Sequence, residues 1–408
     1  MTHSTPPAGR APALTLPART SAAPAAGRLV GVDLARGLAV LGMYAAHVGP
    51  DPSDGGPAGL VMEFAHGRAS ALFALLAGFS LVLMTGRLRP RTGRAGRQAV
   101  ARVLVRAVVL FALGTVLTMA HTDVDVILAF YALYFVCALP LYRLRARTLA
   151  LLAAGSAVVL PQVLYVVQGS IAGSDWADAV TGHDPLARLG GTGGVLGLLF
   201  TGAYPVLTWI PFVLAGMAVA RLDVASAAVR RRLAGAGCAL VVLGHGGSWL
   251  ALHLWPAVPA AIDASNGGTG AGLCAWWSDV AGFPAWDTPA WLLAASPHSE
   301  TTLSVAGNTG VALVVLAGCL ALTERAPLLR KSAEPVTAVG RMSLTAYVLN
   351  VVGIWALGIE DVPGSPLPVL FGFVAVVVLF ALLWSRVFRR GPLEYLLYRA
   401  TGLARLVP

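Results

Sequence analysis

The chain is poor in charge and almost without lysine. Only 12% of its 408 residues are charged, and Lys331 is the only lysine among 29 basic residues. A soluble domain carries about 25% charged residues, so the composition is that of an integral membrane protein. The net charge of +10 would suit a nucleic-acid binder, but the arginines gather in clusters between long apolar segments. This is the positive-inside pattern of membrane proteins, and we expect no nucleic-acid partner.

Cysteines and signature motifs of soluble enzymes are scarce as well. Cys137, Cys238 and Cys319 fall in apolar segments and Cys274 in a loop, so we expect neither a disulfide framework nor a metal site. The sequence has no nucleophile elbow, Walker loop, dinucleotide fingerprint or HExxH motif. Enzyme classes that depend on these motifs are therefore not indicated.

Ten apolar segments separate the arginine clusters. Roughly 20 apolar residues cross a ~30 Å hydrocarbon core, and Pro205 and Pro211 interrupt the one segment that is much longer. Arginine clusters on one side and acidic loops on the other predict an all-α integral membrane protein. It would be a polytopic bundle of about 10 transmembrane helices in a bacterial cytoplasmic membrane, with both termini cytoplasmic. The expected spans are about 29–49, 69–86, 103–120, 124–142, 148–168, 192–220, 233–255, 303–323, 336–358 and 366–386.

The termini differ from the spans in composition. Residues 1–27 are rich in Pro, Ala, Ser and Thr and predict a disordered cytoplasmic tail without a signal-peptide core. Residues 28–232 form the expected N-terminal membrane region, 233–400 the C-terminal membrane region and 401–408 a tail. The basic, amphipathic segment that follows the last span is expected along the inner membrane surface.

The first span carries ionisable residues on one face. On a helix, Asp33, Arg36, Val40, Tyr44 and His47 fall within about 80° of one another, and Asp33 lies about 21 Å from His47. Ionisable groups at membrane depth usually face a bundle interior or a wet cavity. The alternative is that Asp33 and Arg36 neutralise each other while His47 lies in the headgroup layer.

Four further clusters hold polar side chains at or inside the spans. For each, a structural role is the alternative: an exposed loop, a kink, helix–helix hydrogen bonds or an N-cap. The clusters are His66-Gly67-Arg68; Tyr204 and Pro205 with Trp209 and Pro211; Arg341, Thr345, Tyr347 and Asn350; and Pro297-His298-Ser299. Together with the first span they indicate a central polar site, which an enzyme, a transporter or a scaffold without turnover would each explain.

Several segments resemble one known family. The opening RLVGVDLARGLAVLGM (28–43), with the D-x-x-R-G motif at Asp33, Arg36 and Gly37, is similar to the start of the heparan-α-glucosaminide N-acetyltransferase catalytic-domain family and its YeiB-like bacterial relatives. Residues 67–80 resemble the next helix of that family. The YeiB-like C-terminal region, a domain of unknown function, is resembled by residues 204–216, 297–299, 340–347 and 390–399.

The resemblance implies a transmembrane acyltransferase. Such an enzyme moves an acyl group, here expected to be acetyl, from cytoplasmic acyl-CoA to an amine or hydroxyl on the other face, with a histidine as base. The family's histidine lies in the loop after the first helix. Here that loop (about 51–60) has none, and His47 and His66 flank it. The alternative function is a small-molecule permease that uses the same polar-lined pathway.

The resemblance and the polar clusters together give the expected site. Its catalytic residues would be His47, His66 and Asp33. The residues expected to bind acyl-CoA are Arg36, Arg68, Tyr204, Trp209, Arg341, Thr345 and Tyr347. Arginines suit the CoA phosphates, and Arg68 is also a candidate for stabilising the thioester oxyanion. The expected partners are membrane lipid, acyl-CoA and a sugar, lipid or cell-envelope acceptor; a homodimer is allowed for, and no metal is expected.

Overall fold

The computed structural model is helical throughout the described residues, which are 29–408 except 269, 285–286 and 326. The expected disordered tail, 1–27, lies outside them. The helices are α1 (Val30–Val48), α2 (Gly56–Ala65), α3 (Arg68–Thr85), α4 (Gly93–Thr118), α5 (Leu128–Ala138), α6 (Ala146–Ile171), α7 (Asp175–His183), α8 (Pro185–Gly190), α9 (Gly194–Leu196), α10 (Val206–Ala220), α11 (Ala227–Val241), α12 (Gly247–Leu254), α13 (Ala257–Ser265), α14 (Thr302–Arg325), α15 (Pro327–Ser332), α16 (Glu334–Arg341), α17 (Ser343–Leu357), α18 (Leu367–Val387) and α19 (Pro392–Thr401).

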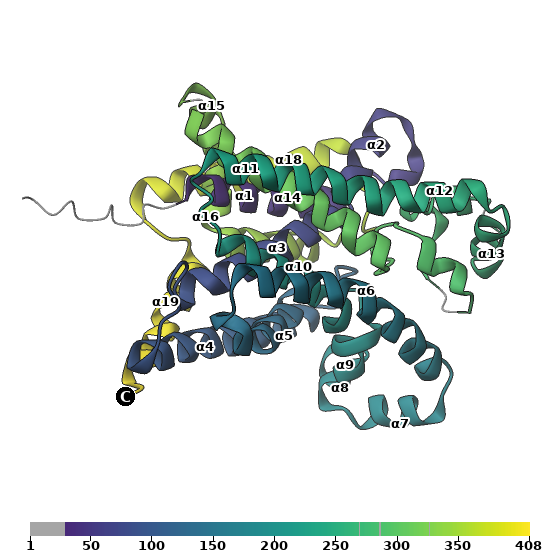
Figure 1. Ribbon diagram of the computed structural model, residues 1–408, viewed down its shortest axis with the longest axis horizontal. Helices are drawn as coiled ribbons and strands as arrows, with labels where there is room; N and C mark the ends of the chain where they lie inside the picture. The colour runs from purple at the N-terminus through teal and green to yellow at the C-terminus, as the bar shows by residue number, and fades with distance from the viewer. Residues whose placement is uncertain (1–28, 269, 285–286, 326) are drawn as a thin grey trace, which may run out of the picture.

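The long helices run side by side in one bundle (Figure 1). Helix α1 packs against α16, α14 and α3, α3 packs against α10, and α10 packs against α6. The short helices α15, α16 and α19 lie at the left end of the view, and α2, α7, α12 and α13 lie at the right end. We call the left end, where several arginines gather, the arginine-rich end, and the right end the histidine end.

Six helices are long and apolar enough to cross a membrane. They are Gly56–Thr85, Gly93–Thr118, Ala146–Ile171, Ala227–Leu254, Thr302–Glu324 and Leu367–Val387, and two bent pairs, Gly194–Thr201 with Val206–Ala220 and Glu334–Arg341 with Ser343–Leu357, raise the number to eight. This confirms an all-helical membrane protein. Helix α1 is not among the eight since Asp33, Arg36 and His47 lower its mean hydropathy, and the apolar helix Leu128–Arg143 is short. The count of ten spans and the cytoplasmic termini stay predictions.

Close glycine contacts let several helices cross at short distance. A Cβ atom on Gly340 of α16 would lie 1.8 Å from the carbonyl oxygen of Asp33 on α1, and one on Gly216 of α10 would lie 1.8 Å from that of Leu75 on α3. Small residues at such crossings let backbones approach, which is how membrane helices gain packing contacts. Helix α1 is held inside the bundle in this way, with its polar face directed at neighbouring helices.

A second, small hydrophobic cluster lies outside the main core. It is formed by the segment between α12 and α14, and its members are Leu252, Ile262, Ala275, Ala281, Trp291 and Ala294. Trp291 is fully buried there and donates a hydrogen bond from its indole nitrogen to Ser265 Oγ at 2.9 Å. This cluster gives a fixed position to the loop that carries Asp279 and to the loop that carries His298.

Candidate functional site

Three histidines from distant parts of the chain line one cavity of about 390 Å³ at the histidine end. His47 comes from the last turn of α1, His66 from the junction of α2 and α3, and His298 from the loop before α14. Four acids, Asp123, Asp125, Asp279 and Glu300, line the same cavity. We call it the histidine cavity.

His66 is oriented by Asp279. Its Nδ1 lies 2.9 Å from Asp279 Oδ2, and its side chain is buried. Since a carboxylate oxygen only accepts, Nδ1 is the protonated nitrogen and Nε2 keeps a lone pair. Nε2 is buried without a hydrogen-bond partner. Burial raises the pKa of Asp279, but the hydrogen bond and charge of His66 lower it more, so the carboxyl lies below its usual range. The pair has the arrangement of a general base and its orienting carboxylate.

Gly67 makes this position of His66 possible. Its φ is +64°, and a Cβ atom there would lie 3.0 Å from Pro297 Cβ. A residue with a side chain would be strained at this φ and would also push the His298 loop away. The glycine beside the histidine, visible in the sequence, therefore brings two of the three imidazoles to one cavity.

Arg68 braces the loop that carries Asp279. Its guanidinium donates to the carbonyl oxygens of Glu63 (2.6 Å), His66 (3.3 Å) and Trp277 (2.7 Å), and it lies over the Trp277 ring. Arg68 does not line the histidine cavity. The structure thus gives Arg68 a positioning geometry, with its donors directed at backbone oxygens.

His47 has an amide partner. Its Nδ1 lies 2.7 Å from Oδ1 of Asn350, a buried residue of α17, and its ring lines the cavity. The Asn350 oxygen accepts from Nδ1, which leaves Nε2 of His47 as an acceptor as well. His47 and His66 are therefore both available as bases, one oriented by a neutral group and one by a carboxylate.

The loop with His298 is strained. His298 and Glu300 have φ values of +55° and +57°, which L-residues rarely adopt and which recur at functional sites. Glu300 accepts from Thr208 Oγ1 at 2.9 Å and from Trp209 Nε1 at 3.0 Å. Burial raises the pKa of Glu300 well above its usual range. Burial lowers the pKa of His298, and Asp125 partly opposes that shift.

Tyr204 and Trp209 form the aromatic wall beside His298. The ring centroids of Tyr204 and Trp209 lie 5.3 and 6.0 Å from the imidazole. Tyr204 lines the cavity, and its carbonyl accepts from Tyr134 Oη at 2.7 Å. Both residues expected in the site are therefore next to it.

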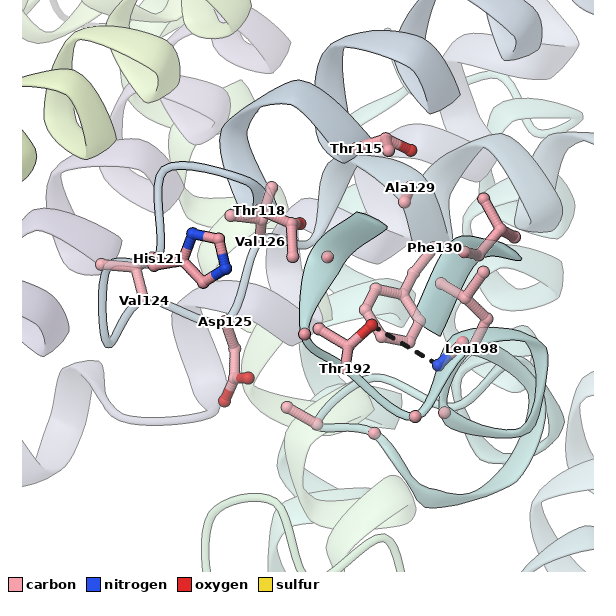
Figure 2. A pocket seen from close by; sticks show the side chains of 18 of the residues that line it. Thr115, Thr118, His121, Val124, Asp125, Val126, Ala129, Phe130, Thr192 and Leu198 are labelled. Atoms are coloured by element: carbon pink, nitrogen blue, oxygen red, sulfur yellow. Dashed lines mark hydrogen bonds between the residues drawn. The ribbon is translucent and has the colours of Figure 1, made fainter. Parts of the chain in front are cut away.

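A larger cavity of about 570 Å³ adjoins the histidine cavity, and the two share five lining residues: Asp123, Val124, Asp125, Gly202 and Ala203. Figure 2 shows Thr115 and Thr118 from α4, His121 and Asp125 from the following loop, and Thr192 from a glycine-rich segment around it. Its lining residues include hydroxyls, carboxylates and backbone, with neither Arg nor Lys. We call it the threonine cavity.

The other end of the polar face of α1 lies at the arginine-rich end. Arg36 donates to Asp33 Oδ1 at 3.0 Å and to Ser80 Oγ at 2.9 Å. Asp33 also lines a cavity of about 430 Å³, the arginine cavity, together with Arg330, Arg341, Arg389 and Arg390. Arg341 is paired with Glu334. Between the two ends, the Tyr44 hydroxyl donates to the Ala346 carbonyl at 2.8 Å. The face of α1 thus reaches cavities at both ends of the bundle and is closed in its middle.

Thr345 and Tyr347 have partners within the protein. Glu394 of α19 accepts from the Thr345 amide and hydroxyl and from the Leu344 amide. The Tyr347 hydroxyl accepts from the Ile127 amide at 3.2 Å. Neither residue lines the histidine, threonine or arginine cavity.

Sequence reasoning missed the four acids of the site, Asp123, Asp125, Asp279 and Glu300. His298 was noted only within its tripeptide. Asp279 is 213 positions from His66, so no local spacing links them. In the described part of the chain, no group of three or more His, Cys, Asp and Glu side chains could hold a metal ion.

Comparison with family models gives the affiliation. The model described as heparan-alpha-glucosaminide N-acetyltransferase, catalytic, matches residues 28–248, which is more than half of the chain. The protein belongs to this family. The model described as a protein of unknown function (DUF418) matches residues 270–404. No curated protein matches the chain.

Both matched parts build the histidine cavity of this acetyltransferase-family protein. Residues 28–248 supply His47, His66 and Asp125, and residues 270–404 supply Asp279 and His298. The hydrogen-bonded pair His66–Asp279 crosses the border between the two matched parts. Residues from both parts are therefore needed to line this cavity.

Proposed function

We propose that the protein transfers an acetyl group from cytoplasmic acetyl-CoA to an amine or hydroxyl acceptor at the extracytoplasmic face. The family is a membrane acetyltransferase family, and acetyl-CoA is the donor that this family implies. The observation that carries the proposal is His66, whose Nδ1 donates to Asp279 while its Nε2 is buried without a partner in a cavity.

Acetyl transfer to an amine or hydroxyl requires one general base. Nε2 of His66 takes the proton of the acceptor amine or hydroxyl while the acceptor nitrogen or oxygen bonds to the thioester carbonyl carbon. The tetrahedral intermediate then expels the CoA thiolate as the C–S bond breaks, and the proton on His66 is available to the leaving sulfur. Asp279 keeps the imidazole in the correct tautomer and stabilises its charged form. His47, oriented by Asn350, is the second candidate for the base.

The donor would approach from the arginine-rich end. Arg36 and Arg341 lie there, and guanidinium groups suit phosphate recognition. Asp33 is a positioning residue in this proposal because it holds Arg36. Residues 36 and 47 are about 16 Å apart along α1, so an extended arm must cross the closed middle of the bundle to reach the histidines.

The acceptor would enter through the threonine cavity. Its hydroxyls and its carboxylates Asp123 and Asp125 accept hydrogen bonds from amines and hydroxyls, and the absence of Arg and Lys from its lining disfavours a phosphate there. Tyr204 and Trp209 supply the aromatic wall beside His298 at the histidine cavity.

The test measures thiol release from acetyl-CoA by the purified protein with a cell-envelope extract as acceptor source. We expect His66→Ala to lower the rate by about 10²–10⁴-fold. His183→Ala is the matched control, because His183 is an exposed histidine on α7. Loss with His47→Ala and not with His66→Ala would move the base to His47. Unchanged rates in both variants would refute the proposal.

A permease is the second candidate. Cavities at both ends and a closed middle are also the geometry of a transporter between its open states. Reconstituted liposomes separate the two: solute flux without CoA release supports transport, and CoA release that depends on an acceptor supports transfer.

A further inference from the structure

Arg106 lies on α4, one of the helices suited to cross a membrane, in the first turn of the expected span 103–120. A charged side chain at that depth is costly, and such residues generally mark a ligand or ion pathway. Arg106 follows Arg94, Arg97 and Arg102 at the end of an arginine cluster, but its side chain borders a pocket inside the bundle. The positive-inside pattern explains the charge of Arg106 but not the pocket beside it.

The guanidinium of Arg106 borders a narrow pocket of about 60 Å³, which we call the Arg106 pocket. Arg36, Ser80 and Tyr131 line it too, together with apolar side chains. Nε of Arg106 and the Tyr131 hydroxyl are both buried without a hydrogen-bond partner, and Tyr131 is only 3% exposed. Native proteins rarely leave such donors unpaired, so two unsatisfied donors in one pocket point to a ligand.

The charge of the pocket is positive. Arg106 and Arg36 both line the pocket, while Asp33 is paired with Arg36. Glu394 is the acid whose charge reaches Arg106, and its oxygens already accept from Leu344 and Thr345. An anionic group in the pocket would therefore meet two cations. The two nearby acids, Asp33 and Glu394, already accept hydrogen bonds from other groups.

We propose that the Arg106 pocket binds the phosphate group of a phosphorylated ligand, with the ligand's uncharged arm directed to the Tyr131 hydroxyl. Arg106 and Arg36 would donate hydrogen bonds to the phosphate, because a guanidinium group can bind two phosphate oxygens through two parallel N–H donors. The small volume suits a phosphate and an unbranched chain better than a ring system. The phosphate could belong to a CoA thioester or to a membrane phospholipid, and the first source would extend the proposed function.

Tyr131 marks the inner limit of this ligand. Its ring packs edge-on against Phe73 (5.3 Å) and Tyr134 (5.4 Å), and Tyr134 donates to the carbonyl of Tyr204 in the wall of the histidine cavity. This aromatic layer separates the two sites. The Tyr131 hydroxyl therefore lies one layer of rings away from the wall of the histidine cavity.

The test uses the full-length protein in detergent or nanodiscs. The probes are CoA, pantetheine (which has no phosphate), and nanodiscs of phosphatidylglycerol or phosphatidylcholine. We expect Arg106→Gln to weaken binding of CoA, or stabilisation by phosphatidylglycerol, by about tenfold or more. Arg102→Gln, on the same helix and outside the lining, should change neither. If Arg106→Gln weakens CoA binding, the phosphate belongs to CoA. If it weakens stabilisation by phosphatidylglycerol, the phosphate belongs to a membrane lipid.

Tyr131→Phe provides an independent arm. Removing an unpaired buried hydroxyl should raise the melting temperature without ligand, while ligand affinity falls several-fold; a purely structural hydroxyl would not give these opposite signs. Equal binding by wild type and Arg106→Gln, or no binding of either probe by the wild type, would overturn the proposal. If the wild type transfers no acetyl group but binds CoA through Arg106, the acetyltransferase proposal fails and this one stands.

Discussion

At Asp279, one carboxylate decides whether His66 can act as a base. In Asp279→Asn, the amide can donate to Nδ1, which leaves the proton on Nε2 and removes the lone pair that faces the cavity. We expect acetyl transfer to fall by about 10²–10⁴-fold with little change in fold. The assay is CoA release, and Asp178→Asn on the exposed face of α7 is the control. An active Asp279→Asn variant would contradict the role of the pair.

The same carboxylate should make stability depend on pH. The pKa of Asp279 in the folded protein is below its ordinary value of 3.8, so its contribution to stability is complete above the unfolded pKa. It is lost as the pH falls through the folded pKa, that is, below about pH 4. Thermal melts between pH 3 and 6 should show this decline in the wild type, and a shallower one in Asp279→Asn. Parallel curves would show that Asp279 carries no such linkage.

Glu300 should behave in the opposite way. Its folded pKa is well above the ordinary 4.5, so the folded state retains a proton that the unfolded state loses. Stability therefore falls as the pH rises above the unfolded pKa and towards the folded pKa. Glu300→Gln keeps the shape and can still accept from Trp209 and donate to Thr208. We expect a higher melting temperature at pH 8 and a flatter dependence on pH. A lower melting temperature at pH 8 would mean that Glu300 is ionised in the folded protein.

At the scale of the helices, the crossing of α3 and α10 depends on glycine. A Cβ atom on Gly216 would lie 1.8 Å from the Leu75 carbonyl oxygen, whereas one on Gly318 of α14 would meet nothing within 4 Å. Gly216→Ala should force the helices apart and cost about 1–3 kcal/mol. Gly318→Ala should be neutral or stabilising by up to about 1 kcal/mol. Melting temperatures of the two variants test this, and equal values would argue against the close crossing.

The helices themselves could be predicted from the sequence, because apolar segments of membrane length are a local signal. Each expected span coincides with a helix or a bent pair of helices, including the break at Pro205. The short helices α7 and α13 were not predicted, since their composition is that of polar loops. In the site, the polar face of α1 was visible as a periodicity. The pairing of His66 with Asp279 was not, because it depends on how two distant loops pack.

For the whole molecule, the number of membrane crossings is the main open prediction. Ten spans require α1 and the short apolar helix Leu128–Arg143 to cross, and neither is among the eight that length and hydropathy support. The interior position of α1 explains how it could cross: its Asp33 and Arg36 pair with each other, and neighbouring helices surround the pair. A homodimer and bound lipid also stay predictions at this scale.

Cysteine labelling in intact cells tests the ten-span topology. In a variant without the four native cysteines, one thiol is introduced at a time by Ser21→Cys, Ser53→Cys, Thr92→Cys or Thr148→Cys. These positions lie before the first span, after the first span, after the second span and after the fourth span. With ten spans, a membrane-impermeant maleimide should label only Ser53→Cys before the cells are permeabilised, because the other three positions lie on the cytoplasmic side with the arginine clusters.

Each alternative topology gives a different pattern of labels. If α1 does not cross, Ser21→Cys reacts in intact cells together with Ser53→Cys, since both then lie on one side of the membrane. If Leu128–Arg143 does not cross, Thr148→Cys reacts in intact cells in addition to Ser53→Cys. The acetyltransferase proposal requires α1 to cross, so Ser21→Cys must not react in intact cells. It requires Asp33 and Arg36 on the side where CoA is made and His47 on the other, and a helix that does not cross cannot place its two ends in this way.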